Sequence, residues 1–196
     1  MSATLATLIE LQRLKRLDRT GWILRGLPNG TESVGAHSFG VAVTAMLLAD
    51  ELLDQGVAID VEKVLRIALL HDWAEARVGD MPRTATLYFG ADARRNAESA
   101  ALADIVSQLK ASSRYLEIYG EYEHRESVEA KLVKAADVLD LLVQVLALER
   151  AGARGLDEFW EVTKESNFQL DGLAKETVDE LVNSILKARS EVVRSC

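Results

Sequence analysis

The sequence is poor in the residues that build disulfides, strands and turns. Cys196 is its single cysteine, so the chain can form neither an internal disulfide nor a cysteine-based zinc site. Only 2 of its 196 residues are proline and 6% are aromatic. Ala, Leu, Val and Glu dominate instead, which is typical of an all-α protein and excludes a β-sandwich or a disordered chain.

Long apolar runs and a basic excess are also missing. No apolar run approaches the roughly 20 residues of a membrane span, and the first residues lack the regions of a signal peptide. We therefore expect a cytoplasmic protein with no membrane partner. The formal net charge of -8 at pH 7 argues against a nucleic-acid polymer as partner, because such a partner requires basic excess. A small anionic substrate in a locally positive pocket remains compatible with this charge.

Apolar residues at helical spacing predict a series of helices and no strand. A length of 196 residues fits one domain, and we find no repeat, low-complexity tract or linker. We expect a single all-α domain over 1–196, with the helices of 156–194 packed on the rest. The helices are expected at about 3–17, 34–54, 61–77, 91–111, 113–122, 125–151, 156–165 and 173–194.

The segment from Leu69 to Asp80, LLHDWAEARVGD, carries most of the chemistry. It places His71 next to Asp72 at the end of an apolar helix. On the expected helix, Glu75 follows one turn later on the same side. A His and an Asp with a further acid nearby are typical of a metal centre that has its own proton donor. A His-Asp pair alone, however, is common by chance.

Two further polar residues, His37 and Asp137, lie in mostly apolar predicted helices. A lone His on an apolar face is usually a satisfied core residue, and Asp137 could simply pair with Lys134 one turn earlier. An unpaired charge in a core is costly, however. Together with His71 and Asp72, these residues match a four-ligand site for one divalent cation on three helices. Imidazole plus carboxylate suits borderline first-row metals.

The pattern His37 … His71-Asp72 … Asp137 resembles the HD superfamily of metal-dependent phosphohydrolases. Five segments resemble its 5′-deoxynucleotidases more closely and occur in the order of that family. The resemblance covers about residues 8–150 and implies a single HD-type helical bundle. The five segments are Arg19–Trp22, Glu32–His37, His71–Glu75, Gly79–Pro82 and Glu129–Asp137.

The resemblance also implies roles for individual residues. Glu75 matches the acid that handles the proton on the leaving-group side, and Asp80 matches a partner that positions the chemistry. One divalent ion (Mn, Co, Mg, Zn or Fe) is implied as cofactor. Its implied ligands are His37, His71, Asp72 and Asp137.

The basic and aromatic segment before the first His matches the nucleotide-binding region of the family. It contains Arg19, Trp22 and Arg25. Its spacing, Arg-Thr-Gly-Trp, differs from members in which Arg and Trp are adjacent, which leaves open which Arg contacts phosphate. Judged by residue type alone, Trp22 also fits a core-edge aromatic, and the two arginines also fit a solvated face.

Two neighbouring activities within the superfamily fit the sequence less well. A two-metal enzyme would need extra His ligands between His71 and Asp137, and the one His there, His124, lies in a polar stretch that is expected at the surface. Hydrolases of guanosine tetraphosphate resemble one another in carrying Glu-Asp after the His-Asp pair, where this chain has Glu75-Ala76.

The expected function is therefore hydrolysis of a nucleoside 5′-monophosphate, with a deoxynucleotide as the best candidate, to nucleoside and phosphate. One alternative is another small-phosphoester hydrolase on the same site. A second alternative is a catalytically idle HD scaffold for protein association. Homodimerisation is common in the resembling family, and the amphipathic 173–194 helix could supply an apolar surface for it.

Overall fold

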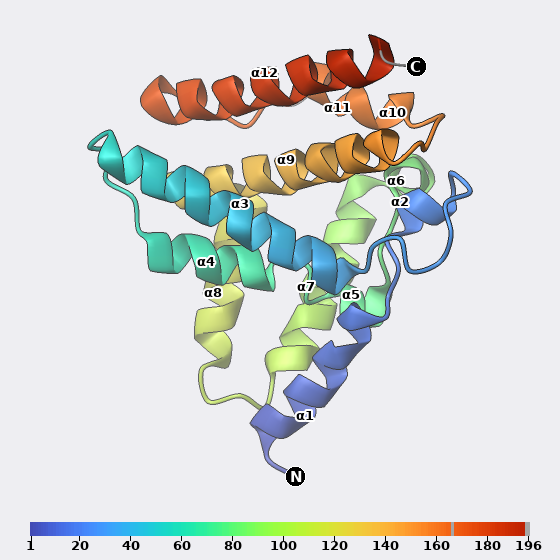
Figure 1. Cartoon of the computed structure of the whole chain (residues 1–196). Coiled ribbons are helices and arrows are strands. Elements are labelled where there is room, and N and C mark those ends of the chain that lie inside the picture. Colours follow the sequence, from blue (N-terminus) through green and yellow to red (C-terminus); the bar gives the residue numbers. More distant parts are fainter. Residues whose placement is uncertain (166, 195–196) are drawn as a thin grey trace. The chain divides into compact units, whose positions relative to one another are not determined.

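A computed structural model describes residues 1–165 and 167–194, so Cys196 lies outside the described part (Figure 1). Those residues form helices and no β-strand, apart from an isolated antiparallel bridge between Asp18 and Ser33. The prediction of an all-α fold is confirmed. The helices are α1 (Ala3–Leu11), η1 (Gln12–Lys15), α2 (Thr20–Ile23), α3 (Val34–Asp54), α4 (Val61–Leu70), α5 (Glu75–Val78), α6 (Arg83–Phe89), α7 (Ala91–Val106), α8 (Ser112–His124), α9 (Val128–Arg150), α10 (Asp157–Trp160), α11 (Val162–Glu165) and α12 (Gly172–Arg194).

The chain divides into two compact units, each made of two separate segments. The first unit consists of Met1–Phe39 and Leu69–Gly120, and the second of Gly40–Ala68 and Glu121–Cys196. The chain passes from one unit to the other inside α3, α4 and α8. A single folding domain over 1–196 stays a prediction.

An apolar core holds the first unit together. Helix α7 contributes Leu102, Ile105 and Val106 to it, each almost completely buried. Leu70 and Ala74, on either side of His71-Asp72, belong to the same core. Full burial of a large aliphatic side chain contributes about 1.5–3 kcal/mol. The segment with the predicted ligands is thus fixed at both ends by apolar packing.

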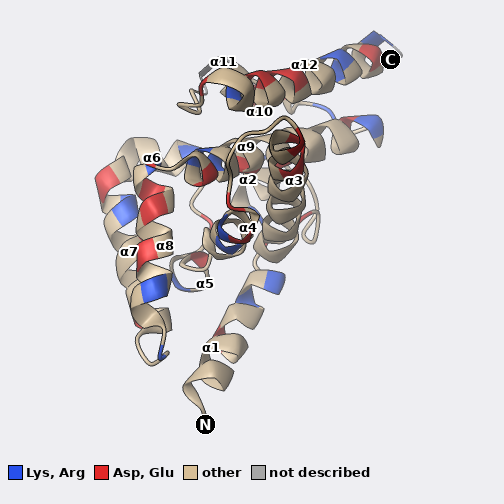
Figure 2. Ribbon diagram, turned by 90° about the vertical axis from the view of Figure 1, so that its left-hand side faces the viewer, with Lys and Arg blue, Asp and Glu red and all other residues tan. Residues whose placement is uncertain are grey.

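In the second unit, α12 packs along α9 (Figure 1). Helix α9 begins at the N-cap Ser127, whose hydroxyl accepts a hydrogen bond from the backbone N–H of Ala130. Its apolar face is buried, and α12 buries Val178 and Ile185. Charged residues occur along α12, as Figure 2 shows, and among them Glu176 and Glu180 are exposed. This amphipathic pattern is why the helix expected at 173–194 is found at Gly172–Arg194.

The helix expected over 61–77 is wrong beyond Leu70. Residues 71–74 form turns in which backbone N–H groups bond to carbonyls three residues earlier, Trp73 to Leu70 and Glu75 to Asp72. No glycine or proline marks this break in the sequence, and the apolar residues continue through it. The apolar period alone therefore could not show where α4 ends.

Helix α6 (Arg83–Phe89) was missed because none of its residues is buried. A helix that buries no face leaves no apolar period in the sequence. Its boundaries are nevertheless readable, since Pro82 precedes its first residue and Gly90, with φ of +86°, ends it. The expected helix at 91–111 corresponds to α7, which ends five residues earlier, at Val106.

Helix α3 is long and apolar enough, by length and composition, to cross a membrane. This is weak evidence, because core helices of soluble proteins pass the same test. Val41, Ala45 and Leu52 of α3 are buried inside the protein. His37 near its start and Asp50 near its end interrupt its apolar character. The absence of a membrane partner stays a prediction.

In the second unit, Gly40 lies very close to the carboxylate of Asp140. A Cβ atom built on Gly40 of α3 would lie 2.0 Å from Oδ1 of Asp140 on α9. Alanine in a helix interior is ordinarily about 1 kcal/mol more favourable than glycine. Here we expect Gly40→Ala to destabilise the protein by about 1–3 kcal/mol, the usual effect of overpacking. Urea unfolding of the two proteins measures the difference.

Asp140→Ala provides the control for this prediction. In a double-mutant cycle, the cost of Gly40→Ala should largely disappear in the Asp140→Ala background, because the clashing oxygen is gone. A Gly40→Ala protein that is more stable than the parent would contradict the close approach.

Candidate metal centre

The first unit brings together three of the four predicted ligands. His37 lies in the first turns of α3, and His71 and Asp72 lie in the turns after α4. The Nε2 atom of His71 is 3.1 Å from Oδ2 of Asp72, and Nε2 of His37 is 3.7 Å from the same oxygen. One donor atom from each of the three lies within 4.8 Å of the others. Ligands that bind a single ion at about 2 Å have separations of about 3–4 Å, so the cluster has the size of a metal site.

The chemistry of these donors fits a divalent cation. His37 and His71 are buried, and Oδ2 of Asp72 is buried without a hydrogen bond from any described residue. Burial by itself would raise the pKa of Asp72. The charge of His71 and its side-chain contact with the carboxylate, together with the charges of His37 and Arg19, outweigh burial and lower that pKa well below its ordinary value. An ionised, buried carboxylate oxygen beside two imidazoles is a donor set for a borderline metal.

Asp137, the fourth predicted ligand, belongs to the second unit. Its Oδ2 accepts hydrogen bonds from Nζ of Lys134 at 2.6 Å and from the hydroxyl of Tyr122 at 3.2 Å. The pairing with Lys134 that the sequence allowed is therefore present. The role of Asp137 as a metal ligand stays a prediction.

Glu75 opens α5 and is 3% exposed. Its Oε2 atom has no hydrogen-bond partner among the described residues. Burial, followed by the charges of Asp72 and Asp80, raises the pKa of Glu75 well above its ordinary value, and Arg19 and Arg94 oppose this only in part. This shift favours the protonated form of the carboxyl group, which is the form that serves as a general acid.

The turn after α4 explains why Glu75 faces Asp72. In turns with hydrogen bonds between residues three apart, side chains at i and i+3 point in the same direction. Asp72 and Glu75 have this separation, and the backbone N–H of Glu75 bonds to the carbonyl of Asp72 at 3.1 Å. The two carboxyl groups are thus neighbours, although the continuous helix expected from the sequence is absent.

Asp80 joins the loop after α5 to the start of α2. Its carboxylate accepts a hydrogen bond from the backbone N–H of Thr20, and its backbone carbonyl accepts one from the Thr20 hydroxyl at 2.8 Å. Nη1 of Arg19 lies 3.6 Å from Oδ1 of Asp80 and 3.6 Å from Oδ2 of Asp72. Arg19 is therefore placed beside the carboxylates of the site. Whether it binds substrate stays a prediction.

Trp22 and Arg25 differ in their surroundings. Trp22 is 1% exposed, and its Nε1 donates to Oε2 of Glu32 at 2.7 Å. This burial matches the core alternative that the sequence left open. Arg25 is half-buried in the turn after α2, where its Nη1 donates to the carbonyl of Leu24 at 3.4 Å. Their roles in substrate binding stay predictions.

Sequence reasoning missed two charged residues of α7, Arg94 and Glu98. Helix α7 packs against α5, which carries Glu75. Nε of Arg94 donates to Oε1 of Glu98 at 2.6 Å. The only sequence signal is the spacing of four residues between Arg and Glu, which is typical of an ordinary pair on a solvated helix face.

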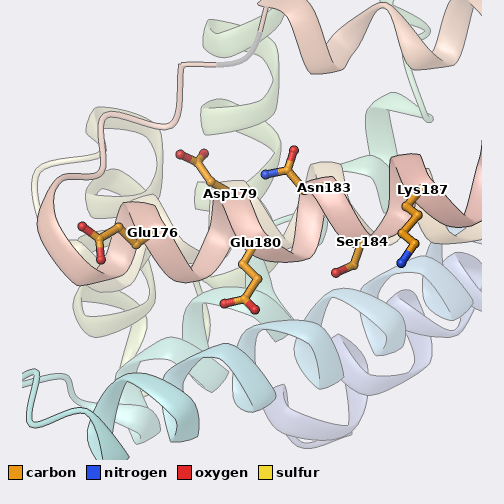
Figure 3. A pocket seen from close by; sticks show the side chains of 6 residues that line it. All are labelled: Glu176, Asp179, Glu180, Asn183, Ser184 and Lys187. Carbon is orange, nitrogen blue, oxygen red and sulfur yellow. The ribbon is translucent and has the colours of Figure 1, made fainter.

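A separate hollow lies along α12 in the second unit (Figure 3). None of the predicted site residues lines it. Acidic side chains dominate its lining, as on many solvated helices, so it does not replace the centre in the first unit as a candidate site. The lining residues are Glu176, Asp179, Glu180, Asn183, Ser184 and Lys187.

Comparison with known proteins places this chain in a family. A family model described as HD domain matches residues 11–176. The 5′-deoxynucleotidase HDDC2 of Homo sapiens is 33% identical over 186 residues, which cover 91% of this chain and 86% of that protein. The protein of the same name from Xenopus laevis is 35% identical over 156 residues, which cover 77% and 73%.

A solved structure is similar over nearly the whole chain. The PH0347 protein from Pyrococcus horikoshii OT3 is 37% identical, with a TM-score of 0.78, and the match covers 93% of this chain and 98% of that one. The HD-type helical fold expected from the sequence is confirmed by these matches, and the chain belongs to the HD domain family.

Proposed function

We propose that this protein hydrolyses deoxynucleoside 5′-monophosphates to nucleoside and inorganic phosphate. The observation that carries the proposal is the cluster of His37, His71 and Asp72 with the buried Glu75 beside it. The 5′-deoxynucleotidases similar to this chain support the choice of substrate. The family is metal-dependent, and we propose one divalent ion per chain, held by these three residues and Asp137.

When bound, the ion would supply Lewis-acid polarisation of the phosphoryl group and a water of lowered pKa. The residues of the chain would supply the rest. As water attacks phosphorus, the bond between phosphorus and the 5′-oxygen breaks, and Glu75 gives its proton to that leaving oxygen. Arg19 lies beside Asp72 and Asp80, where it would bind phosphoryl oxygens. Burial of Glu75 raises its pKa and so favours the protonated form that this step requires.

A phosphate-release assay tests the proposal. Purified protein is incubated with each divalent metal and with deoxynucleoside monophosphates, ribonucleoside monophosphates and unrelated phosphomonoesters. Release from the deoxynucleotides supports the proposal. Release only from other esters would indicate a different small-phosphoester hydrolase, and no release with any metal would favour the idle scaffold.

The sugar preference is a separate prediction. We expect kcat/KM for deoxyadenosine monophosphate to exceed that for adenosine monophosphate by roughly 10- to 100-fold, because a buried hydroxyl without a partner costs about 1–3 kcal/mol. The Arg19–Trp22 segment is the proposed source of the discrimination. Parallel measurements of kcat/KM decide the prediction, and equal values would contradict it.

The burial of Trp22 determines which variant should be used for that test. Trp22→Ala would open a cavity and cost about 3–5 kcal/mol, so stability would change before selectivity could be measured. Trp22→Phe retains most of the packing. It should reduce the ratio of kcat/KM for deoxyadenosine monophosphate to that for adenosine monophosphate, mainly by raising kcat/KM for the ribonucleotide. A cytoplasmic location and a homodimer stay predictions.

A further inference from the structure

Two arginines, Arg19 and Arg94, interact with the carboxyl groups of the candidate site. Arg19 lies 3.6 Å from both Asp72 and Asp80. Arg94, on α7, interacts electrostatically with Glu75 and Asp72. Figure 2 shows both signs of charge along α7. The resemblance had left open whether Arg19 or Arg25 contacts phosphate, and Arg94 lies outside the segment that contains those two residues.

The guanidinium of Arg94 is fixed at one edge and open at the other. Its Nε donates to Oε1 of Glu98 at 2.6 Å, and Glu98 is buried. The side chain of Arg94 is 33% exposed, and its Nη groups hydrogen bond to none of the residues that the structure describes. Arginine held in this way presents two parallel N–H donors, the arrangement that suits a phosphate or carboxylate.

Arg94 lies on α7, which packs against α5, the helix that begins with Glu75. Burial opposes its positive charge, but Glu98, Glu75 and Asp72 outweigh burial and raise its pKa. A phosphomonoester carries a charge between -1.5 and -2 at pH 7. Asp72 and Asp80 would repel that charge, so a substrate phosphate needs cations in addition to a bound metal. Arg94 supplies one at the α7 side of Glu75.

We propose that Arg94 binds the phosphoryl group of the substrate through its Nη donors, while Glu98 holds Nε and sets the orientation of the guanidinium. This inference rests on the proposed function and adds to it a phosphate-binding residue on α7. Glu98 is then a positioning residue. The alternative is that the ion pair between Arg94 and Glu98 only stabilises α7.

Arg94→Gln is the main test, and Arg95→Gln is its matched control. Arg95 is the next residue on the same helix, is 56% exposed at the side chain and pairs with Asp92. We expect Arg94→Gln to lower kcat/KM and to weaken competitive inhibition by inorganic phosphate, each by roughly 10- to 100-fold, as for a lost charge-assisted hydrogen bond. Inhibition by the product nucleoside, which has no phosphate, should be unchanged, as should the metal content. Arg95→Gln should change none of these quantities.

Two further variants keep the test decisive if Arg94→Gln folds poorly. Arg94→Lys preserves the positive charge but lacks the two parallel N–H donors, so its affinity for phosphate should lie between those of Arg94→Gln and the parent. Glu98→Gln should weaken phosphate binding less than Arg94→Gln does. Unchanged phosphate affinity in both Arg94 variants would overturn the proposal, even if kcat fell, because Arg94 would then act only through Glu75 or the fold.

Calorimetry separates this proposal from the proposed function. Titration of inorganic phosphate into metal-loaded protein needs no turnover. If the unmutated protein binds phosphate, Arg94→Gln does not, and no nucleotide is hydrolysed, then the nucleotidase proposal fails while the role of Arg94 stands. If the unmutated metal-loaded protein binds no phosphate, the role of Arg94 is overturned.

Discussion

Replacing His71 with alanine is expected to reduce the bound metal from about one ion per chain to almost none and to bring phosphate release to the background of the assay. The imidazole Nε2 lies 3.1 Å from Oδ2 of Asp72, so its loss removes a donor from the centre of the cluster. A catalytic metal both polarises the phosphoryl group and lowers the pKa of water from 15.7 to about 7. No other group in the site can replace both effects.

Elemental analysis of the purified proteins checks this prediction without any assay of activity. His37→Ala and Asp72→Asn should lose metal as His71→Ala does, since their donor atoms lie in the same cluster. His124→Ala is the matched control, because His124 is an exposed histidine at the end of α8. Equal metal content in His71→Ala and the parent would remove the basis of the proposed centre.

Asp137→Asn extends the same measurement to the fourth predicted ligand. If Asp137 binds the ion, this variant should lose metal. In the structure, Oδ2 of Asp137 accepts hydrogen bonds from Lys134 and Tyr122. If Asp137 serves only to pair with Lys134, metal content should stay at the level of the parent. The two outcomes separate the alternatives that the sequence left open.

The sequence predicted the helices that bury an apolar face. It did not predict a helix that buries no residue. The stripe of Val41, Ala45, Leu48 and Leu52 located α3 at its observed bounds, because these residues must face a core. Helix α6 buries no residue and left no such stripe. The end of α4 was missed for a related reason, since Ala74 continues the apolar pattern through a turn made only by backbone hydrogen bonds.

For the site, residue type predicted more than residue spacing did. A His-Asp pair, a further His and a further Asp in apolar helices are recognisable together, because burying such groups is costly unless they are paired or bind a metal. Trp22 was assigned to substrate binding from the resemblance of its segment to a family, but a sequence cannot show that its indole is buried and hydrogen bonded to Glu32. Arg94 could not be found, because its link to Glu75 depends on the packing of α7 against α5.

Replacing Glu75 with glutamine is expected to leave the metal in place and to lower kcat by roughly 10²- to 10⁴-fold, the range of general acid–base catalysis. Glutamine has the shape of a protonated glutamic acid, and burial already favours the protonated form of Glu75. The fold should therefore change little, whereas the proton for the leaving 5′-oxygen is lost. Glu75→Ala should show a similar loss of turnover.

Metal content and turnover must be measured on the same preparations, because the two quantities distinguish a proton donor from a ligand. Glu51→Gln, an exposed acid on α3, is the matched control and should behave as the parent does. A Glu75→Gln protein that has lost its metal would mean that Glu75 is itself a ligand. A protein that keeps both metal and full turnover would mean that the leaving oxygen takes its proton from solvent. Retained metal with slow turnover is the result that the buried, unpartnered Oε2 atom of Glu75 leads us to expect.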